Sequence, residues 1–231
     1  APTAIARQNL LDEKVPSSQI FVTGNTVIDA LFSVLPQAKK MNFSIELLKK
    51  IPFLEYDSHM LPKIILVTGH RRENFGSGFE EICFALRQIS KENKDVQIIY
   101  PVHLNPNVRD PVNRILSNLD NVHLIEPLEY LAFVKLMDLS YFILTDSGGI
   151  QEEGPSLGKP VLVMRDTTER PEALEAGTVK LAGADHGKIV RLASELLNDD
   201  LVYTQMSKAH NPFGDGNSSK LIRDILIKRN V

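Results

Sequence analysis

The sequence predicts an α/β fold, built as a doubly wound parallel sheet with helices on both faces. Between residues 63 and 182, six short apolar runs that are typical of buried strands alternate with amphipathic helical patterns. Near the centre, Tyr141–Arg170 contains an apolar run, a Ser-Gly-Gly turn, a short helix and a second apolar run. Strands and helices that alternate in this way form right-handed crossovers between parallel strands.

Residues 1–60 precede the regular alternation and are predicted to carry four elements. The longest is a helix with Val27, Ile28 and Leu31 on one face. Proline lacks the N–H group that a helix interior needs, so Pro36 is expected to end this helix. In order, we expect a helix over 4–13 capped by Thr3, a strand over Gln19–Thr23, a helix from Asn25 or Thr26, and a short helix around Ile45–Leu48.

The regular alternation starts at residue 63. Its first helix is expected to begin with a capping box, in which Ser77 and Glu80 satisfy free backbone N–H groups. Gly158 is expected to end the short helix that follows the Ser-Gly-Gly turn. The predicted strands are 63–67, 96–102, 122–125, 141–145, 161–164 and 179–182, and the predicted helices are 77–89, 107–119, 130–139, 149–157, 170–176, 188–197, 201–209 and 218–228.

Composition and charge exclude several classes of protein. The net charge of −3 gives no general attraction to nucleic acid or to a membrane surface. No apolar run approaches the roughly 18 residues of a membrane span, and no signal peptide is visible. Cys83 is the only cysteine, so no internal disulfide can form, which is typical of a reducing compartment. We therefore expect a cytoplasmic protein.

The first residues suggest a piece of a longer protein. The chain begins at Ala1 without a methionine and enters a helical pattern at once. A sequence that starts inside a longer protein looks like this, and a processed or tagged chain is the alternative. We expect the first of these.

Polar side chains gather in the loops that follow the predicted strands. Such loops lie at the carboxyl edge of a parallel sheet, where ligands bind in these folds. Thr68–Asn74 holds His70, Arg71 and Arg72, and arginine is a fork donor to phosphate or carboxylate. We interpret this loop as an anion clamp, the alternative being a solvated loop. His103 follows the next strand, although a lone histidine is more often structural.

The third loop is the turn that begins at Asp146. Gly148 and Gly149 permit the backbone to approach a phosphate or diphosphate closely. Glu152 and Glu153 follow, either as acceptors for sugar hydroxyls or as favourable acids near a helix start, and both interpretations stay open. A fourth loop, 165–170, adds arginine, threonine and acidic residues. Together the loops suit a nucleoside diphosphate sugar.

Several familiar site motifs are absent from the sequence. It has neither the Walker pattern G-x-x-x-x-G-K-[ST] nor the dinucleotide fingerprint G-x-G-x-x-G. It has no H-x-x-x-H or cysteine pair that would suit metal ligation. The residue types would permit a Ser-His-Asp hydrolase, but G-x-S-x-G is missing.

Five motifs, which together span most of the chain, resemble those of the non-hydrolysing bacterial UDP-N-acetylglucosamine 2-epimerases. The Gram-negative members of that family make precursors of enterobacterial common antigen and capsule. The motifs are F-V-T-G-N-T-V-I-D-A-L (21–31), V-T-G-H-R-R-E-N-F-G (67–76), Y-P-V-H-L-N-P-N-V (100–108), L-T-D-S-G-G-I-Q-E-E (144–153) and P-S-L-G-K-P-V-L-V-M-R-D-T-T-E-R-P-E (155–172).

The resemblance implies the GT-B fold, in which a UDP-sugar binds between two Rossmann-like domains. It assigns residues 1–24 to the last helix and strand of a truncated first domain and 25–60 to a linker helix and connection. Residues 61–209 are then the UDP-binding second domain, and 210–231 a helix that returns toward the first domain. Most of the first domain, with the family's acid and base carboxylates, is expected to be missing.

The implied reaction is the reversible epimerisation of UDP-N-acetylglucosamine to UDP-N-acetylmannosamine at C2. UDP is eliminated across C1 and C2 and then added back. This isomerase is expected to need no cofactor or metal, to bind UDP-sugars and UDP rather than nucleic acid or membrane, and to be a homodimer when intact. The fragment alone is expected to be inactive. The alternatives are the donor domain of a GT-B glycosyltransferase and a non-catalytic UDP-sugar-binding fragment.

The resemblance also implies roles for single residues. His70 matches the active-site histidine, which stabilises the departing UDP phosphate or moves a proton there. Arg71 and His103 match a second, regulatory UDP-N-acetylglucosamine site of some members. For UDP itself, Ser147, Gly148 and Gly149 match the diphosphate turn, Glu153 the carboxylate that holds the ribose hydroxyls, Phe133 a neighbour of uracil, and Arg170 an arginine that contacts UDP.

Overall fold

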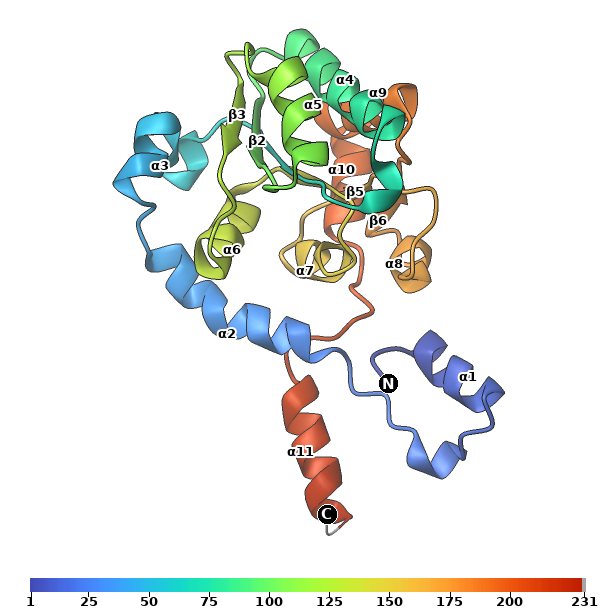
Figure 1. Cartoon of the computed structure of the whole chain (residues 1–231). Helices are drawn as coiled ribbons and strands as arrows, with labels where there is room; N and C mark the ends of the chain where they lie inside the picture. Colours follow the sequence, from blue (N-terminus) through green and yellow to red (C-terminus); the bar gives the residue numbers. More distant parts are fainter. Residues whose placement is uncertain (230–231) are drawn as a thin grey trace.

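The computed structural model, which describes residues 1–229, contains a single six-stranded parallel sheet (Figure 1). The strand order is β3-β2-β1-β4-β5-β6. All six strands predicted from the sequence are present, and every neighbouring pair is parallel. The strands are β1 (Ile64–Thr68), β2 (Gln97–Pro101), β3 (Val122–Ile125), β4 (Phe142–Thr145), β5 (Val161–Val163) and β6 (Val179–Leu181).

Helices cover both faces of the sheet. Because successive side chains of a strand point to opposite faces, each strand contributes to the core on both sides. In β1, Ile65 and Val67 contribute to one core cluster, and Ile64 and Leu66 to the other. All four are fully buried, as an apolar run without alternation predicts. The predicted doubly wound α/β architecture is therefore confirmed.

The helices divide between the two core clusters. Those on the side of Ile65 are α4 (Ser77–Glu92), α5 (Pro106–Leu116), α9 (His186–Asn198) and α10 (Asp200–Ser207). Those on the side of Ile64 are α2 (Thr26–Lys40), α3 (Ile45–Lys50), α6 (Tyr130–Leu139), α7 (Ile150–Ser156) and α8 (Pro171–Glu175).

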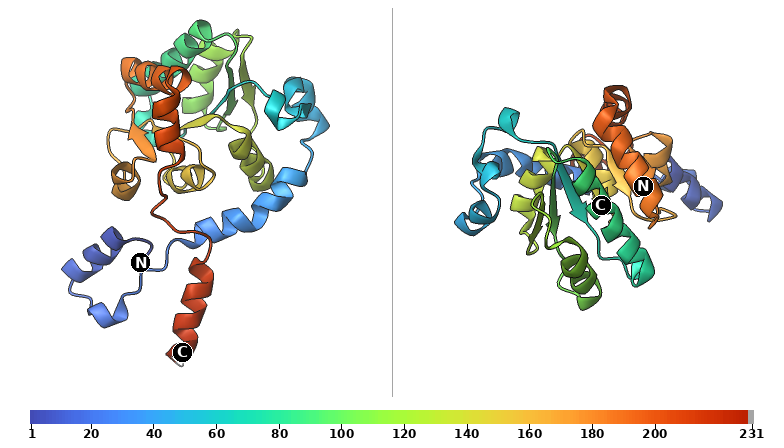
Figure 2. Two further views of the ribbon diagram at one scale, coloured as in Figure 1. Left: turned by 180° about the vertical axis from the view of Figure 1, so that it is seen from behind. Right: turned by 90° about the horizontal axis from the view of Figure 1, so that it is seen from above.

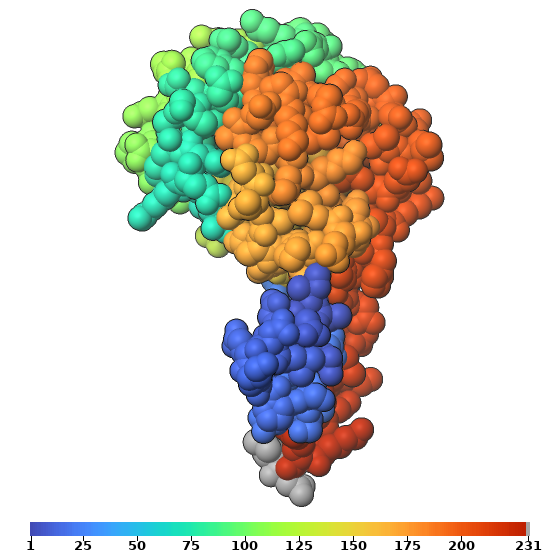
Figure 3. All heavy atoms as spheres, turned by 90° about the vertical axis from the view of Figure 1, so that its right-hand side faces the viewer, coloured from blue at the N-terminus to red at the C-terminus, as the bar shows by residue number. Residues whose placement is uncertain are grey.

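Two segments project together from the sheet domain. One is α1 (Ala4–Asp12) with the chain that follows it, and the other is α11 (Ser218–Lys228). Figures 1 and 2 show both on the side of the sheet below α2, and Figure 3 shows them forming a narrow extension. The last two residues of the predicted segment 210–231 lie outside the described residues. Within residues 1–229, no helix combines the length and apolar character that crossing a membrane requires.

Three local predictions were wrong. Gln19–Thr23 forms no strand: Gln19 ends a short 3-10 helix, Ser17–Gln19, and the residues after it bond to Ala1 through Phe21 and Thr23 without pairing to a second strand. Helix α2 continues past Pro36 to Lys40, since the following turn buries Ala38 in the core.

The third concerns the start of α4. Gly76 caps this helix with a φ of 86°, Ser77 is already helical, and no side-chain cap is present. The Glu80 carboxylate pairs with Arg114 on α5 instead. The helix therefore begins where the sequence predicts, but without a capping box.

Candidate functional site

The strand order creates a topological switch point at the centre of the sheet, between β1 and β4. From β1 the chain proceeds to β2 and β3 on one side, whereas β4 leads to β5 and β6 on the other. Thr68 and Thr145, the last residues of β1 and β4, lie opposite each other in register, and their hydroxyl oxygens are 2.6 Å apart. Ligands bind at such switch points in open α/β sheets, so the loops after β1 and β4 define the candidate site.

Asp146 joins these two loops. It follows β4 directly and is fully buried. Its Oδ2 accepts hydrogen bonds of 2.7 Å from the backbone N–H groups of His70 and Arg71. Its Oδ1 lies 3.5 Å from Nδ1 of His70. One carboxylate thus fixes the path of the loop after β1 and faces the predicted active-site imidazole.

The three charged residues predicted in the neighbouring loops lie close together. The rings of His70 and His103 stack with centroids 5.5 Å apart. The Arg71 guanidinium lies 3.2 Å from the Glu169 carboxylate, which also pairs with Arg165. Its own backbone N–H and these two guanidinium groups hold the pKa of Glu169 below its ordinary value. The loop after β1 therefore brings its own imidazole, His70, and an already partnered guanidinium, Arg71, next to the imidazole of His103 in the loop after β2.

The glycine turn faces this group from the end of β4. A Cβ atom on Gly148 would lie 3.5 Å from Oε1 of Glu169 and 3.8 Å from Arg71. A Cβ atom on Gly149 would lie 3.8 Å from Oε2 of Glu153. Ser147 continues the turn by donating its N–H to the Thr145 hydroxyl at 3.0 Å. Gly149 is exposed, whereas Gly148 is buried, and the Cβ distances above are ordinary van der Waals contacts. The turn therefore lies directly beside Arg71, Glu153 and Glu169.

Glu153 lies in α7 and is buried. The Tyr130 hydroxyl, at the start of α6, donates a 2.6 Å hydrogen bond to its Oε1. Burial and, to a smaller extent, the neighbouring Glu152 carboxylate raise the pKa of Glu153 above its ordinary value of 4.5, although the Tyr130 hydrogen bond acts in the opposite direction. The ionised form of Glu153 is therefore disfavoured by its desolvation. A ligand that donates two hydroxyl hydrogen bonds to the carboxylate would stabilise this form.

This burial predicts a pH-dependent stability gain for Glu153→Gln. A carboxyl group whose pKa is raised on folding contributes stability below the unfolded-state pKa, and that contribution is lost as the pH rises through the folded-state pKa. Glutamine cannot ionise and keeps an oxygen for Tyr130. We expect the variant without ligand to unfold at a higher denaturant concentration than the wild type at pH 8, and at nearly the same one at pH 4.5.

The control for this comparison is Glu129→Gln, an exposed residue beside Tyr130. It is expected to show no pH-dependent difference from the wild type. A gain in Glu153→Gln that is equally large at both pH values would contradict the burial argument.

Glu152, the preceding residue of α7, has different partners. Its side chain is only 2% exposed. Its Oε1 accepts from Nε of Arg170, and its Oε2 accepts from the Asn25 amide at 2.5 Å. Both acids are buried in the first turn of α7, so their position is consistent with either interpretation, as acceptors for sugar hydroxyls or as favourable acids near the helix start.

The structure brings most of the predicted site residues to the carboxyl edge. His70, Arg71, His103 and the turn 147–149 lie around Asp146 and Glu169, as described above. Phe133 lies on α6, one turn beyond Tyr130, and is partly buried. Asp146 and Tyr130 were not among the candidates. The position of Asp146 directly after a buried strand was a usable signal, whereas Tyr130 gave none.

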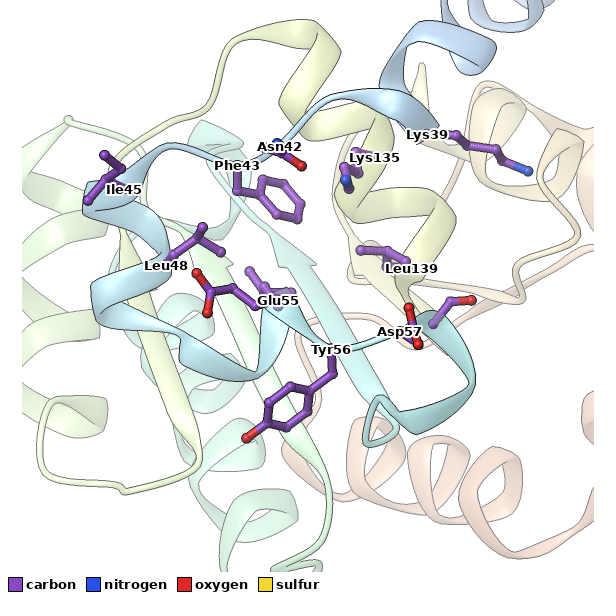
Figure 4. Close-up of a pocket in the computed structure, with 12 residues that line it drawn as sticks. Lys39, Asn42, Phe43, Ile45, Leu48, Glu55, Tyr56, Asp57, Lys135 and Leu139 are labelled. Atoms are coloured by element: carbon purple, nitrogen blue, oxygen red, sulfur yellow. The ribbon is translucent and has the colours of Figure 1, made fainter.

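A separate cavity lies elsewhere in the molecule. It measures about 630 Å³ and is lined by α2, α3, α6 and the segment before β1, including Phe43, Tyr56 and Lys135 (Figure 4). Leu139 and Ser58, which precede β4 and β1, place it toward the edge where the strands begin. It is separate from the candidate site. Within residues 1–229, no three His, Cys, Asp or Glu side chains converge as a metal site would require.

Comparisons with known proteins point to one family. The model of the family described as UDP-N-acetylglucosamine 2-epimerase matches residues 1–227. The UDP-N-acetylglucosamine 2-epimerase of Escherichia coli (strain K12) is 59% identical over 227 residues, which cover 98% of this chain and 59% of that protein.

Two solved structures are also similar. The enzyme from Neisseria meningitidis bound to UDP-GlcNAc has 49% identity and a TM-score of 0.90, with 99% of this chain and 60% of that one covered. The enzyme from Methanocaldococcus jannaschii in complex with UDP-GlcNAc and UDP has 33% identity and a TM-score of 0.77, with 99% and 60% covered. The chain thus spans about 60% of these relatives. Since the family model matches nearly all of it, the protein belongs to the UDP-N-acetylglucosamine 2-epimerase family.

Proposed function

We propose that this chain is the UDP-binding part of an enzyme that interconverts UDP-N-acetylglucosamine and UDP-N-acetylmannosamine in the cytoplasm, for surface polysaccharide precursors. The main support is the switch point between β1 and β4, because the loops that follow these two strands carry the motifs that resemble the family's. Related structures hold UDP-GlcNAc and UDP. The intact enzyme is proposed to be a homodimer.

The proposed orientation of UDP follows from the positions of these groups. The diphosphate lies against Ser147, Gly148 and Gly149, a turn that follows β4 and lies beside Arg71 and Glu169. The ribose hydroxyls donate to Glu153, whose Oε1 is already held by Tyr130. The uracil then extends along α6 toward Phe133. Arg170 contacts UDP from the loop after β5.

The chemical step that we propose begins with elimination. A base removes the C2 proton, the C1–O bond breaks, and UDP leaves with the bonding electrons, giving 2-acetamidoglucal. Re-addition of UDP at C1 and of a proton to the opposite face of C2 completes the epimerisation. His70, oriented by Asp146, stabilises the departing phosphate by hydrogen bonding or donates a proton to it.

We propose in addition that Arg71 and His103 serve a second, regulatory UDP-N-acetylglucosamine site. Both side chains touch the catalytic neighbourhood: His103 stacks on His70, and Arg71 pairs with Glu169 beside Gly148. A ligand bound to Arg71 and His103 would therefore change the position or the surroundings of the His70 side chain directly.

We propose that UDP binding and the acid–base chemistry belong to two different domains. This predicts that the 231-residue chain alone does not epimerise UDP-N-acetylglucosamine. Residues 1–24 and 210–231 are proposed to adjoin a further domain that supplies the acid and base carboxylates. A missing base leaves the C2 proton in place, and without the further domain the site stays in water, so no turnover is expected. The measurement is formation of UDP-N-acetylmannosamine from UDP-N-acetylglucosamine without an acceptor.

The intact E. coli relative serves as the positive control in the same assay. The chain alone is still expected to bind UDP, although weakly, and an NMR titration measures this binding. Turnover by the chain alone would refute the proposed separation of UDP binding from the acid–base chemistry, and failure to bind UDP at any accessible concentration would refute the proposed nucleotide site.

A further inference from the structure

Glu152 occupies an unusual position beside the proposed nucleotide site. Its carboxylate is 2% exposed, and its two oxygens have partners from distant parts of the chain, Arg170 and Asn25. We propose that Glu152 is a positioning residue that sets the direction of the Arg170 side chain for UDP. This inference rests on the proposed function, in which Arg170 contacts UDP.

The contacts of Arg170 explain why its direction needs support. Its Nε donates to Glu152, and its Nη1 donates to the Glu169 backbone carbonyl at 3.1 Å. The side chain is 32% exposed, so part of it remains accessible to a ligand. A free arginine carries about 2 kcal/mol of rotamer entropy, which it would lose on binding. Two hydrogen bonds that form before the ligand arrives reduce that cost.

Glu152 is itself held from the other side. The Asn25 amide donates to Oε2 at 2.5 Å, and the Asn211 amide donates to the Glu152 backbone carbonyl at 2.9 Å. The backbone N–H of Asn25 donates to the carbonyl of Phe213 at 2.7 Å. The two segments that leave the sheet domain toward α1 and α11 therefore meet at Glu152. This anchorage holds the carboxylate in one place, as a buried charge requires.

A double-mutant cycle with UDP tests the proposal. UDP affinity is measured by NMR titration of the chain for wild type, Glu152→Ala, Arg170→Met and the double variant. We expect Arg170→Met to weaken binding by about 10- to 100-fold, as for a lost charge-assisted hydrogen bond. Glu152→Ala should weaken it by about 10-fold. In the double variant the Glu152 substitution should add nothing, because the residue acts through Arg170.

Three results would overturn the proposal. Unchanged affinity in Glu152→Ala shows that positioning is unnecessary. Losses that multiply in the double variant show that Glu152 acts independently of Arg170. Unchanged affinity in Arg170→Met removes Arg170 from the UDP site, which also corrects the proposed function. Loss in Arg170→Met with multiplying effects overturns the present inference alone.

Further variants show whether a loss of UDP affinity comes from a failure to fold. Glu152→Gln keeps the side-chain volume and has one acceptor oxygen, so either Arg170 or Asn25 loses its partner. About a 3-fold loss is expected, again absent in the Arg170→Met background. If Glu152→Ala does not fold, the same criterion of non-additivity applies to Glu152→Gln. Glu175→Ala, an exposed acid on α8, is the matched control and should bind UDP like the wild type.

Discussion

Replacing Glu153 by alanine is expected to weaken UDP binding by about 10- to 100-fold. A carboxylate that accepts hydrogen bonds from ribose hydroxyls contributes about 1.5–3 kcal/mol, and 1.4 kcal/mol is a factor of ten in affinity. Tyr130 holds Oε1 at 2.6 Å, which fixes the direction of the carboxylate before UDP binds. The measurement is the dissociation constant of UDP for the chain, by calorimetry or NMR titration.

A comparison of two nucleotides shows whether the lost contact is to ribose. The wild type is expected to bind UDP more tightly than 2′-deoxy-UDP, because 2′-deoxy-UDP lacks the 2′-hydroxyl group that would donate a hydrogen bond to Glu153. In Glu153→Ala this preference should disappear, since both nucleotides lack the acceptor. Glu129→Gln, exposed and adjacent to Tyr130, should retain it. Equal UDP affinities for wild type and Glu153→Ala would remove Glu153 from the ribose site.

Glu153 also illustrates why a binding residue lowers stability. Burial raises its pKa, so the ionised form that UDP needs is the form that the folded chain without ligand disfavours. Glutamine should therefore improve stability at neutral pH and impair binding at the same time. Opposite effects of one substitution on the two properties are typical of functional sites.

The strands were predictable because their burial is a property of short continuous segments. Each strand lies between two layers of helices, and full burial selects runs such as 64–67 without polar interruption. The strand order was not predictable from these runs. It depends on which neighbours pair, and β1 lies beside β4 because of contacts between residues 77 positions apart, such as Thr68 and Thr145.

The errors occurred where a local signal competed with tertiary contacts. Pro36 weakens a helix locally, but the burial of Ala38 in the core keeps the chain helical. Gln19–Thr23 has the composition of a strand, yet a strand exists only when another backbone pairs with it. Glu80 could have capped α4, but an arginine on α5 binds its carboxylate.

The candidate site shows the same limit. The turn 147–149 and the loop after β1 could be found from the sequence, because the residues of each are consecutive in the chain. The pairings Asp146 with His70 and Arg71, Glu153 with Tyr130, and Glu152 with Arg170 were not found. They join residues between 18 and 76 positions apart, and only the folded chain shows which acid faces which donor. The roles assigned to these residues stay predictions until binding is measured.

Replacing Asp146 by alanine is expected to lower the free energy of unfolding by about 3 kcal/mol. The substitution leaves the backbone N–H groups of His70 and Arg71 without their acceptor, in hydrogen bonds that are partly buried. An unsatisfied buried donor costs about 1–3 kcal/mol, and we expect each of these two to cost an amount in the lower half of that range. The two bonds of 2.7 Å also hold the loop after β1 against the glycine turn. Chemical denaturation of wild type and variant measures the loss, and UDP binding should weaken with it.

Two further substitutions separate the structural effect from a general loss of charge. Asp146→Asn keeps an oxygen that accepts from both N–H groups, so we expect about 1 kcal/mol of destabilisation. Asp138→Ala removes an acid whose partner Lys39 is 56% exposed, and such pairs contribute at most about 1 kcal/mol. If Asp146→Ala destabilises no more than Asp138→Ala, the loop after β1 does not depend on Asp146. The position of His70 at the switch point would then need another cause, because no other side chain of the sheet edge bonds to the backbone of both His70 and Arg71 within residues 1–229.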